Sequence, residues 1–444
     1  MASKECIEQD KHLYYYKIEV GVPPLAMVDD LLCVSKCGLK SVQLNAFVNA
    51  KTNLKKLQFG ITKCHKMHVG KQSAVCLDLY VDSWELKNAD EIFTGVEDLV
   101  DEENGESKLN TVESEKYLGD VISSDGRNKK NVLARRAKGV GIVNQIVKIL
   151  EGTCYGPFVF EVGLILRKSL LINSILTNSE SWYGLKDEEL ELLEQVDEML
   201  LRKFLEVGRC CPKEMLYLET GSWPIRFVVM SRRLMFLHYL LNEEKESLVS
   251  RFLQAQIKNP VKDDWILTVK ENLEELDIWL EFDDIETLSE ASFKKFLDEK
   301  IENRVLEYLN NIKSKHSKVM DIKHETLKMQ SYLEAPNQVN SQLSKFIFHA
   351  RTRMLDVKLN FKNKYINQSK NCPLGCTIVD NQEHLLNCPY IENKLGMSCV
   401  SAHNSPDYYN LFAEDSAKQT KIAAVGWLKI FKMSEIHYFR PPCG

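Results

Sequence analysis

The chain has 444 residues, of which 44% are hydrophobic and 27% are charged, and this predicts a globular protein with a large core. The same composition excludes a disordered or collagen-like chain. The formal net charge of −5 excludes a chain that is basic throughout, so any affinity for nucleic acid must come from local segments.

The cysteines and the longest apolar stretch bear on where the protein resides. Thirteen cysteines, an odd number spread over a long chain, favour a reduced intracellular protein over a secreted disulfide scaffold. Residues 158–176 are the most apolar long stretch, but Glu161, Arg167 and Lys168 interrupt it, so we expect no membrane span. The sequence does not distinguish a nuclear from a cytoplasmic location.

Two short apolar runs, LAMV and LLCV, lie within residues 25–34 and are separated only by Asp29 and Asp30. This pattern predicts a β-hairpin with two carboxylates at its tip. The carboxylates can serve simply as turn residues. Alternatively they hold divalent metal, because adjacent like charges repel one another unless a cation lies between them.

The next segments alternate between predicted structure and a solvated region. A helix is expected at residues 39–56, followed by a turn at 60–63 that leads into a strand. Residues 82–120 contain thirteen acidic residues against three lysines, which indicates a solvated, partly irregular insertion. The segment KYLGDVISSDG, residues 116–126, returns to strand character with a turn at its end.

From Asn128 almost to residue 360 the periodicity predicts helices. Residues 128–150 space Val132, Ile142, Val143, Ile146, Ile149 and Leu150 along one helical face. A second helix is expected at 187–207, whose core face would consist of Leu193, Val196, Leu200, Phe204 and Val207. We expect the aromatic residues Trp182, Tyr183, Trp265 and Trp279 to pack in helical cores rather than to stack on bases.

Near the C-terminus, four potential metal ligands follow the pattern Cys372-x3-Cys376-x7-His384-x3-Cys388. Three thiolates and an imidazole suit tetrahedral Zn²⁺, and four protein ligands indicate a closed structural site. Pro373 and Gly375 favour a tight turn between the first two cysteines. The alternative is a chance grouping of cysteines in a chain that has many.

Two segments carry a local excess of positive charge. Residues 127–148 hold seven basic residues and no acidic one, and residues 345–370 hold seven against Asp356 alone. Such clusters either contact phosphates of nucleic acid or form solvated helix faces. As contact residues we predict Arg127, Lys129, Lys130, Arg135, Arg136, Arg351, Arg353 and Lys358.

The order of PPLAMVDDLLCVS, LQFGITKC and KYLGDVIS resembles the palm of reverse transcriptases, and in detail those of non-LTR (LINE-type) retrotransposons. The resemblance implies that Asp29 and Asp30 hold catalytic Mg²⁺ and that Lys63 lies near the incoming nucleotide. It continues through LLINSILTNSESWYGL, RRLMFLHYLL and the Cys/His segment, which is where relatives carry a zinc knuckle that holds RNA or DNA.

The resemblance also implies an α+β fold: a partial polymerase palm sheet, then a mostly helical thumb and linker, then a small zinc knuckle. The expected segments are a palm with an acidic insertion at 1–126, a thumb-like region at 127–210, a linker at 211–365, the knuckle at 366–392 and a tail at 393–444.

A two-metal polymerase site needs a third carboxylate on a separate strand. Asp10 is the sole aspartate before Asp29, and it lies in the polar context IEQDKH. We therefore expect the C-terminal portion of a reverse transcriptase that does not polymerise DNA by itself. A clipped gene model, a decayed element and a captured fragment fit equally. The alternative is a non-catalytic protein that binds nucleic acid. Oligomeric state stays open.

Overall fold

The computed structural model describes residues 25–27, 30–32, 64–69, 80–81, 107–108, 110–153, 158–260, 264–316, 318–320, 322, 324–334, 341–355, 357–372, 375–382, 384 and 388–389. The chain divides into two compact units, and each unit is assembled from separate segments. Unit 1 comprises Met1–Ala134, Glu180–Lys186 and Phe236–Asn272, and unit 2 comprises Arg135–Ser179, Asp187–Met235 and Leu273–Gly444. The five segments expected from the sequence stay predictions.

The first described strands form the hairpin that the apolar runs predict. Strand β1 (Leu25–Met27) pairs antiparallel with β2 (Asp30–Leu32), and Met27 lies opposite Asp30. This register leaves a two-residue connection, so the hairpin prediction is confirmed for the backbone. Asp29, at the tip, lies outside the described residues.

The remaining described strands also occur in pairs: β3 (His65–Lys66) with β6 (Asn110–Thr111), β4 (Tyr80–Val81) with β5 (Ser107–Lys108), and β7 (Ser114–Tyr117) with β8 (Asp120–Ser123). The last pair confirms the strand character expected after residue 116. Its connection lies within KYLGDVIS, at Leu118 and Gly119, whose φ angles of 48° and 90° are typical of a tight hairpin turn.

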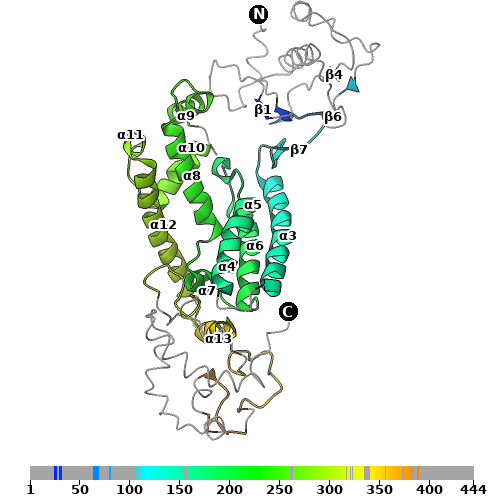
Figure 1. Cartoon of the computed structure of the whole chain (residues 1–444), viewed down its shortest axis with the longest axis vertical. Coiled ribbons are helices and arrows are strands. Elements are labelled where there is room, and N and C mark those ends of the chain that lie inside the picture. Colours follow the sequence, from blue (N-terminus) through cyan, green and yellow to red (C-terminus); the bar gives the residue numbers. More distant parts are fainter. Residues whose placement is uncertain are drawn as a thin grey trace, which may run out of the picture. The chain divides into compact units, whose positions relative to one another are not determined.

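Helices occupy most of the chain between residues 129 and 351, as the periodicity predicts (Figure 1). They are α3 (Lys129–Thr153), α4 (Val159–Leu166), η3 (Arg167–Ile172), α5 (Asn173–Ile175), η4 (Ser179–Ser181), α6 (Asp187–Leu205), α7 (Lys213–Thr220), α8 (Ile225–Leu241), α9 (Leu248–Lys258), α10 (Trp265–Glu275), α11 (Phe282–Thr287), α12 (Glu290–Lys313) and α13 (Ser341–Arg351). Helices with small two-stranded sheets give a general α+β class. Among the described residues, no helix is both long enough and apolar enough to cross a membrane.

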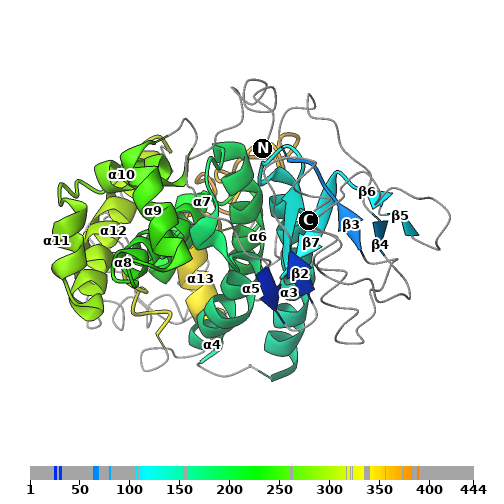
Figure 2. The ribbon, with the colours of Figure 1, turned by 90° about the horizontal axis from the view of Figure 1, so that it is seen from above.

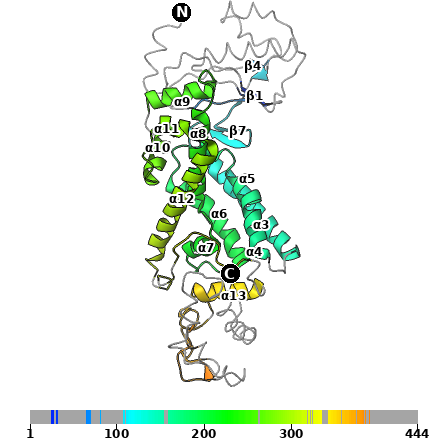
Figure 3. The ribbon, with the colours of Figure 1, turned by 60° about the vertical axis from the view of Figure 1, so that its left-hand side comes forward.

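The core of unit 2 forms where α3, α4 and α6 run side by side (Figures 2 and 3). Leu193, Val196, Leu200 and Phe204 of α6 are all buried, which confirms the predicted face. Gly139 of α3 allows the helices to approach closely, because a Cβ there would lie 2.8 Å from Cγ1 of Val196. Ile149 is 42% exposed, contrary to its place in the predicted stripe, whereas Leu150, also predicted there, is buried.

The prediction for the aromatic residues holds for two of the four. Trp182 and Trp265 are buried, and the indole of Trp265 donates a hydrogen bond to the carbonyl oxygen of Glu180. The prediction was wrong for Tyr183 and Trp279, which are 42% and 77% exposed. Both lie in connections between helices, and Tyr183 directly follows the buried Trp182 in one of them.

Candidate metal centre and its basic surroundings

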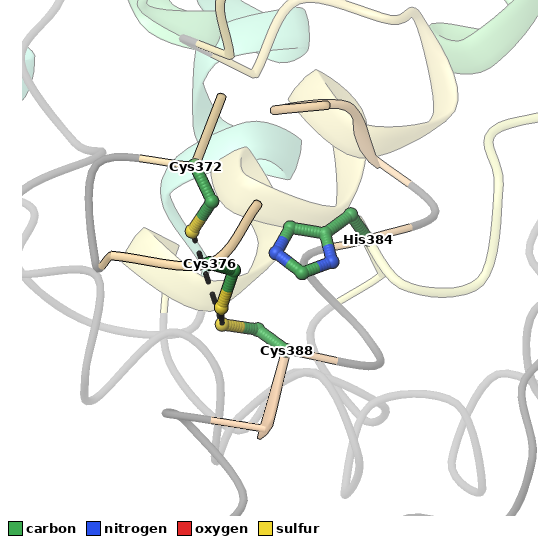
Figure 4. Close-up of side chains that lie close together, drawn as sticks. All are labelled: Cys372, Cys376, His384 and Cys388. Atoms are coloured by element: carbon green, nitrogen blue, oxygen red, sulfur yellow. Dashed lines mark hydrogen bonds between the residues drawn. The ribbon is translucent and has the colours of Figure 1, made fainter. Parts of the chain in front are cut away.

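Three thiols and an imidazole converge in unit 2, as the ligand spacing predicts. The ligand atoms of Cys372, Cys376, His384 and Cys388 all lie within 4.8 Å of one another (Figure 4). The Cys388 sulfur lies 3.9 Å from that of Cys372 and 3.4 Å from that of Cys376. Two thiolates bound to one zinc at 2.3 Å each would lie about 3.8 Å apart, so the spacing fits a shared metal. A disulfide would need about 2.05 Å.

The local backbone explains how the segment brings its ligands together. Asn371 and Val379 form an antiparallel bridge, and the amide of Cys372 donates to the carbonyl of Ile378. Between them, Gly375 adopts φ +94°, a conformation open to glycine, so that the chain reverses just before Cys376. The sequence prediction of a tight turn at this place is confirmed.

His384 is held in a form that can bind a metal. Its backbone N–H donates a hydrogen bond to Oδ1 of Asn381, 2.6 Å away. The side chain is buried, and its Nε2 has no hydrogen-bond partner among the described residues. Burial lowers the pKa of His384, although Asp380 acts in the opposite direction. The lowered pKa favours the neutral imidazole, which is the form that binds a metal. A buried nitrogen without a hydrogen bond is costly unless a ligand such as a metal satisfies it.

Helix α13, which precedes the metal ligands, is tied to α7 by a buried ionic network that the sequence did not reveal. Glu219 at the end of α7 accepts hydrogen bonds from Nε and Nη2 of Arg351 at 2.8 Å and 3.0 Å. The Tyr332 hydroxyl donates to the same carboxylate at 2.6 Å, and Nε2 of His324 lies 2.8 Å from it. Behind His324, the Lys313 ammonium lies 3.2 Å from Nδ1.

The pKa values of Glu219, His324 and Lys313 are all lowered, which favours a charged carboxylate but neutral His324 and Lys313 side chains. Burial by itself would raise the pKa of Glu219, but Arg351 and His324 more than offset it, so its pKa lies below the ordinary value. Burial lowers the pKa of His324 despite its hydrogen bond to Glu219. Burial also lowers the pKa of Lys313 to about 8, with Glu219 opposing that shift.

The structure places Arg351, which the sequence predicts to contact nucleic acid, in the buried network. Its side chain is buried and its guanidinium is held by Glu219, so it stabilises the fold, and its contact with a phosphate stays a prediction. Lys358 is half-buried, and its ammonium donates to the carbonyls of Ser369 and Asn371, just before the first metal ligand. Arg353 is half-buried and borders an open hollow in unit 2.

The basic residues at 127–136 also include both buried and exposed side chains. Arg135 is buried, and its guanidinium donates to the carbonyls of Ser174 and Thr177, so the structure shows it packed inside unit 2 while its contact with nucleic acid stays a prediction. Exposed side chains remain at Arg127, Lys129, Lys130 and Arg136. Of these, Lys130 lies 3.7 Å from the Glu113 carboxylate.

The residues predicted to form a polymerase site stay untested by the structure. Asp29 and Lys63 lie outside the described residues. Asp30 is the first residue of β2, and only its backbone is described.

An open hollow in unit 2 contains residues that the sequence prediction missed as a group. Lys318, Phe361, Lys362 and Lys364 line it together with Arg353 and Gln382. The signal in the sequence was the alternation of lysine, asparagine and phenylalanine at 358–364, but Lys318 comes from a distant segment.

No protein-family model, curated protein or solved structure matches this chain.

Proposed function

We propose that this chain derives from a non-LTR retrotransposon reverse transcriptase and binds RNA or DNA through a zinc knuckle and the basic residues that precede it in the sequence. The observation that carries the proposal is the convergence of three thiols and the buried His384 imidazole within residues 372–388. This donor set fits Zn²⁺ better than a hard cation, which prefers oxygen ligands.

Cys372, Cys376, His384 and Cys388 would hold the zinc, and with four protein ligands the site would be structural. When bound, the zinc supplies folding free energy to the module. Arg353, Lys362 and Lys364 lie close by along the chain, and the last two are exposed, which suits contact with phosphates.

Metal content tests the first half of the proposal. The purified, reduced chain is expected to retain about one zinc per molecule by elemental mass spectrometry, because four ligands close the site. Cys376→Ser should lose most of that zinc. Cys210→Ser is the matched control, since Cys210 is an exposed thiol outside the cluster, and it should keep the metal. Equal zinc in both variants would contradict the assignment.

Fluorescence anisotropy with labelled RNA and DNA tests the second half. Binding is expected to weaken steeply as salt rises from about 50 to 200 mM, because phosphate contacts release counterions. Chelation of the zinc should reduce affinity, and restoring the metal should recover it. Binding that ignores both salt and zinc would exclude the proposed interface.

Polymerase activity is the second candidate function, and the antiparallel pairing of β1 with β2, in which Met27 lies opposite Asp30, supports it. By the resemblance, Asp29 and Asp30 would hold Mg²⁺ and Lys63 would lie near the nucleotide. Primer extension with Mg²⁺ that is lost in Asp29→Ala would make polymerisation the function. Nucleic-acid binding without extension would leave the binding role alone.

A further inference from the structure

An open hollow of about 700 Å³ lies in unit 2. Its volume falls within the range of about 300–1,000 Å³ that is usual for small-molecule sites. The residues that line it are Cys210, Lys318, Arg353, Leu359, Asn360, Phe361, Lys362, Asn363, Lys364 and Gln382. Four of these described side chains are cationic and none is a carboxylate, so the hollow is suited to an anionic ligand.

The cations come from segments that the fold brings together. Lys318 follows α12 and reaches the segment near residue 360, where its ammonium donates to the Asn360 carbonyl at 2.9 Å. Lys362 and Lys364 are exposed at the rim. Arg353 has φ +58°, a left-handed conformation that is uncommon for a residue with a side chain and that often accompanies functional sites.

Two further features indicate more than a bare anion. The aromatic ring of Phe361 lines the hollow, with the Lys318 ammonium 6.0 Å from its centroid. Gln382 is buried, its amide nitrogen donates to the Ala350 carbonyl, and its Oε1 accepts no hydrogen bond from the described residues. A ligand that combines phosphate, a flat ring and N–H donors would match this set of groups.

We propose that this hollow binds a segment of single-stranded nucleic acid, with phosphates on Lys362, Lys364 and Lys318 and one unpaired base against Phe361. The inference rests on the proposed function and deepens it by selecting single strands over duplex. An unpaired base exposes its face to an aromatic side chain, whereas stacking within a duplex covers that face.

The test uses the full, zinc-loaded chain and fluorescein-labelled oligothymidylate, in parallel with the same strand annealed to its complement. Wild type should bind the single strand more tightly than the duplex. Phe361→Leu should weaken single-strand binding about tenfold, because stacking on an aromatic ring contributes that order of affinity per base. Lys362→Gln with Lys364→Gln should lower the slope of log affinity against log salt by about 1.4, which is about 0.7 for each phosphate contact.

Lys295→Gln is the matched control, because Lys295 is an exposed lysine on α12 outside the hollow, and its salt slope should stay at the wild-type value. Zinc content and circular dichroism must be unchanged in every variant. Equal affinity for duplex and single strand, or unchanged binding in Phe361→Leu, would overturn the inference.

The two proposals fail in different ways. Binding that depends on zinc, Lys362 and Lys364, but is the same in Phe361→Leu and equal for duplex and single strand, would remove the single-strand assignment of this hollow and leave the proposed function intact. A wild-type chain that binds neither form of the oligonucleotide would remove both. Displacement of the single strand by polyglutamate at equal charge concentration would assign the hollow to an acidic peptide and refute the nucleic-acid assignment.

Discussion

Replacing Glu219 with glutamine removes the negative charge from the buried network that joins α7 to α13. Arg351 would then keep a buried guanidinium and lose the negative charge to which its Nε and Nη2 donate. Removing one partner of a buried ion pair costs about 3–5 kcal/mol. This is a large fraction of the roughly 5–15 kcal/mol that stabilises a folded domain.

Urea denaturation followed by circular dichroism measures this loss, and hydrogen exchange locates it. Exchange is expected to rise first in α7 and α13, since the network joins these two helices. Asp298→Asn is the matched control: Asp298 pairs with Lys294 at 2.8 Å on the exposed side of α12. A surface pair of this kind contributes about 0.3–0.5 kcal/mol, so the control should be nearly as stable as wild type.

A double variant separates the charge effect from lost packing. Glu219→Leu with Arg351→Met leaves no unpaired charge from this pair and should be less destabilised than the sum of the two single variants. If Glu219→Gln unfolded at the same urea concentration as Asp298→Asn, the buried network would not stabilise the fold and the reasoning would be refuted.

Three further outcomes follow from local features. Gly221→Ala should lower the melting temperature much more than Gly184→Ala, because both glycines have positive φ but a Cβ at Gly221 would overlap the backbone of a neighbouring loop, whereas Gly184 has open space. Stability should fall as pH drops below about 6.5, because the folded state lowers the pKa of His324 from its ordinary 6.5 and the unfolded chain then takes up the proton more readily. In His324→Gln that slope, measured by urea denaturation at several pH values, should decrease. At pH 8 a thiol reagent should modify Cys210 well before Cys211, since burial raises the pKa of the Cys211 thiol to about 12 and the side chain is buried, and fragment mass spectrometry of the shared peptide can separate the two.

Local patterns in the sequence determined the features whose physics is local. The hairpin at residues 25–32 follows from two apolar runs around a short polar connection, and the face of α6 follows from helical periodicity. The four metal ligands could be predicted because they lie close together along the chain, within residues 372–388, and a turn of a few residues suffices to bring them together.

Only the tertiary structure determined which charged residues are exposed at the surface and which are buried in the core. Arg351 and Arg353 are two residues apart in a basic segment, yet the first is buried against Glu219, 132 residues away, and the second borders an open hollow. Likewise Lys318 joins Phe361 only through folding. A sequence shows which side chains are charged. Whether such a side chain is buried, and which distant residue it pairs with, depends on packing between segments. These two factors determine whether an arginine stabilises a helix junction or can contact a phosphate.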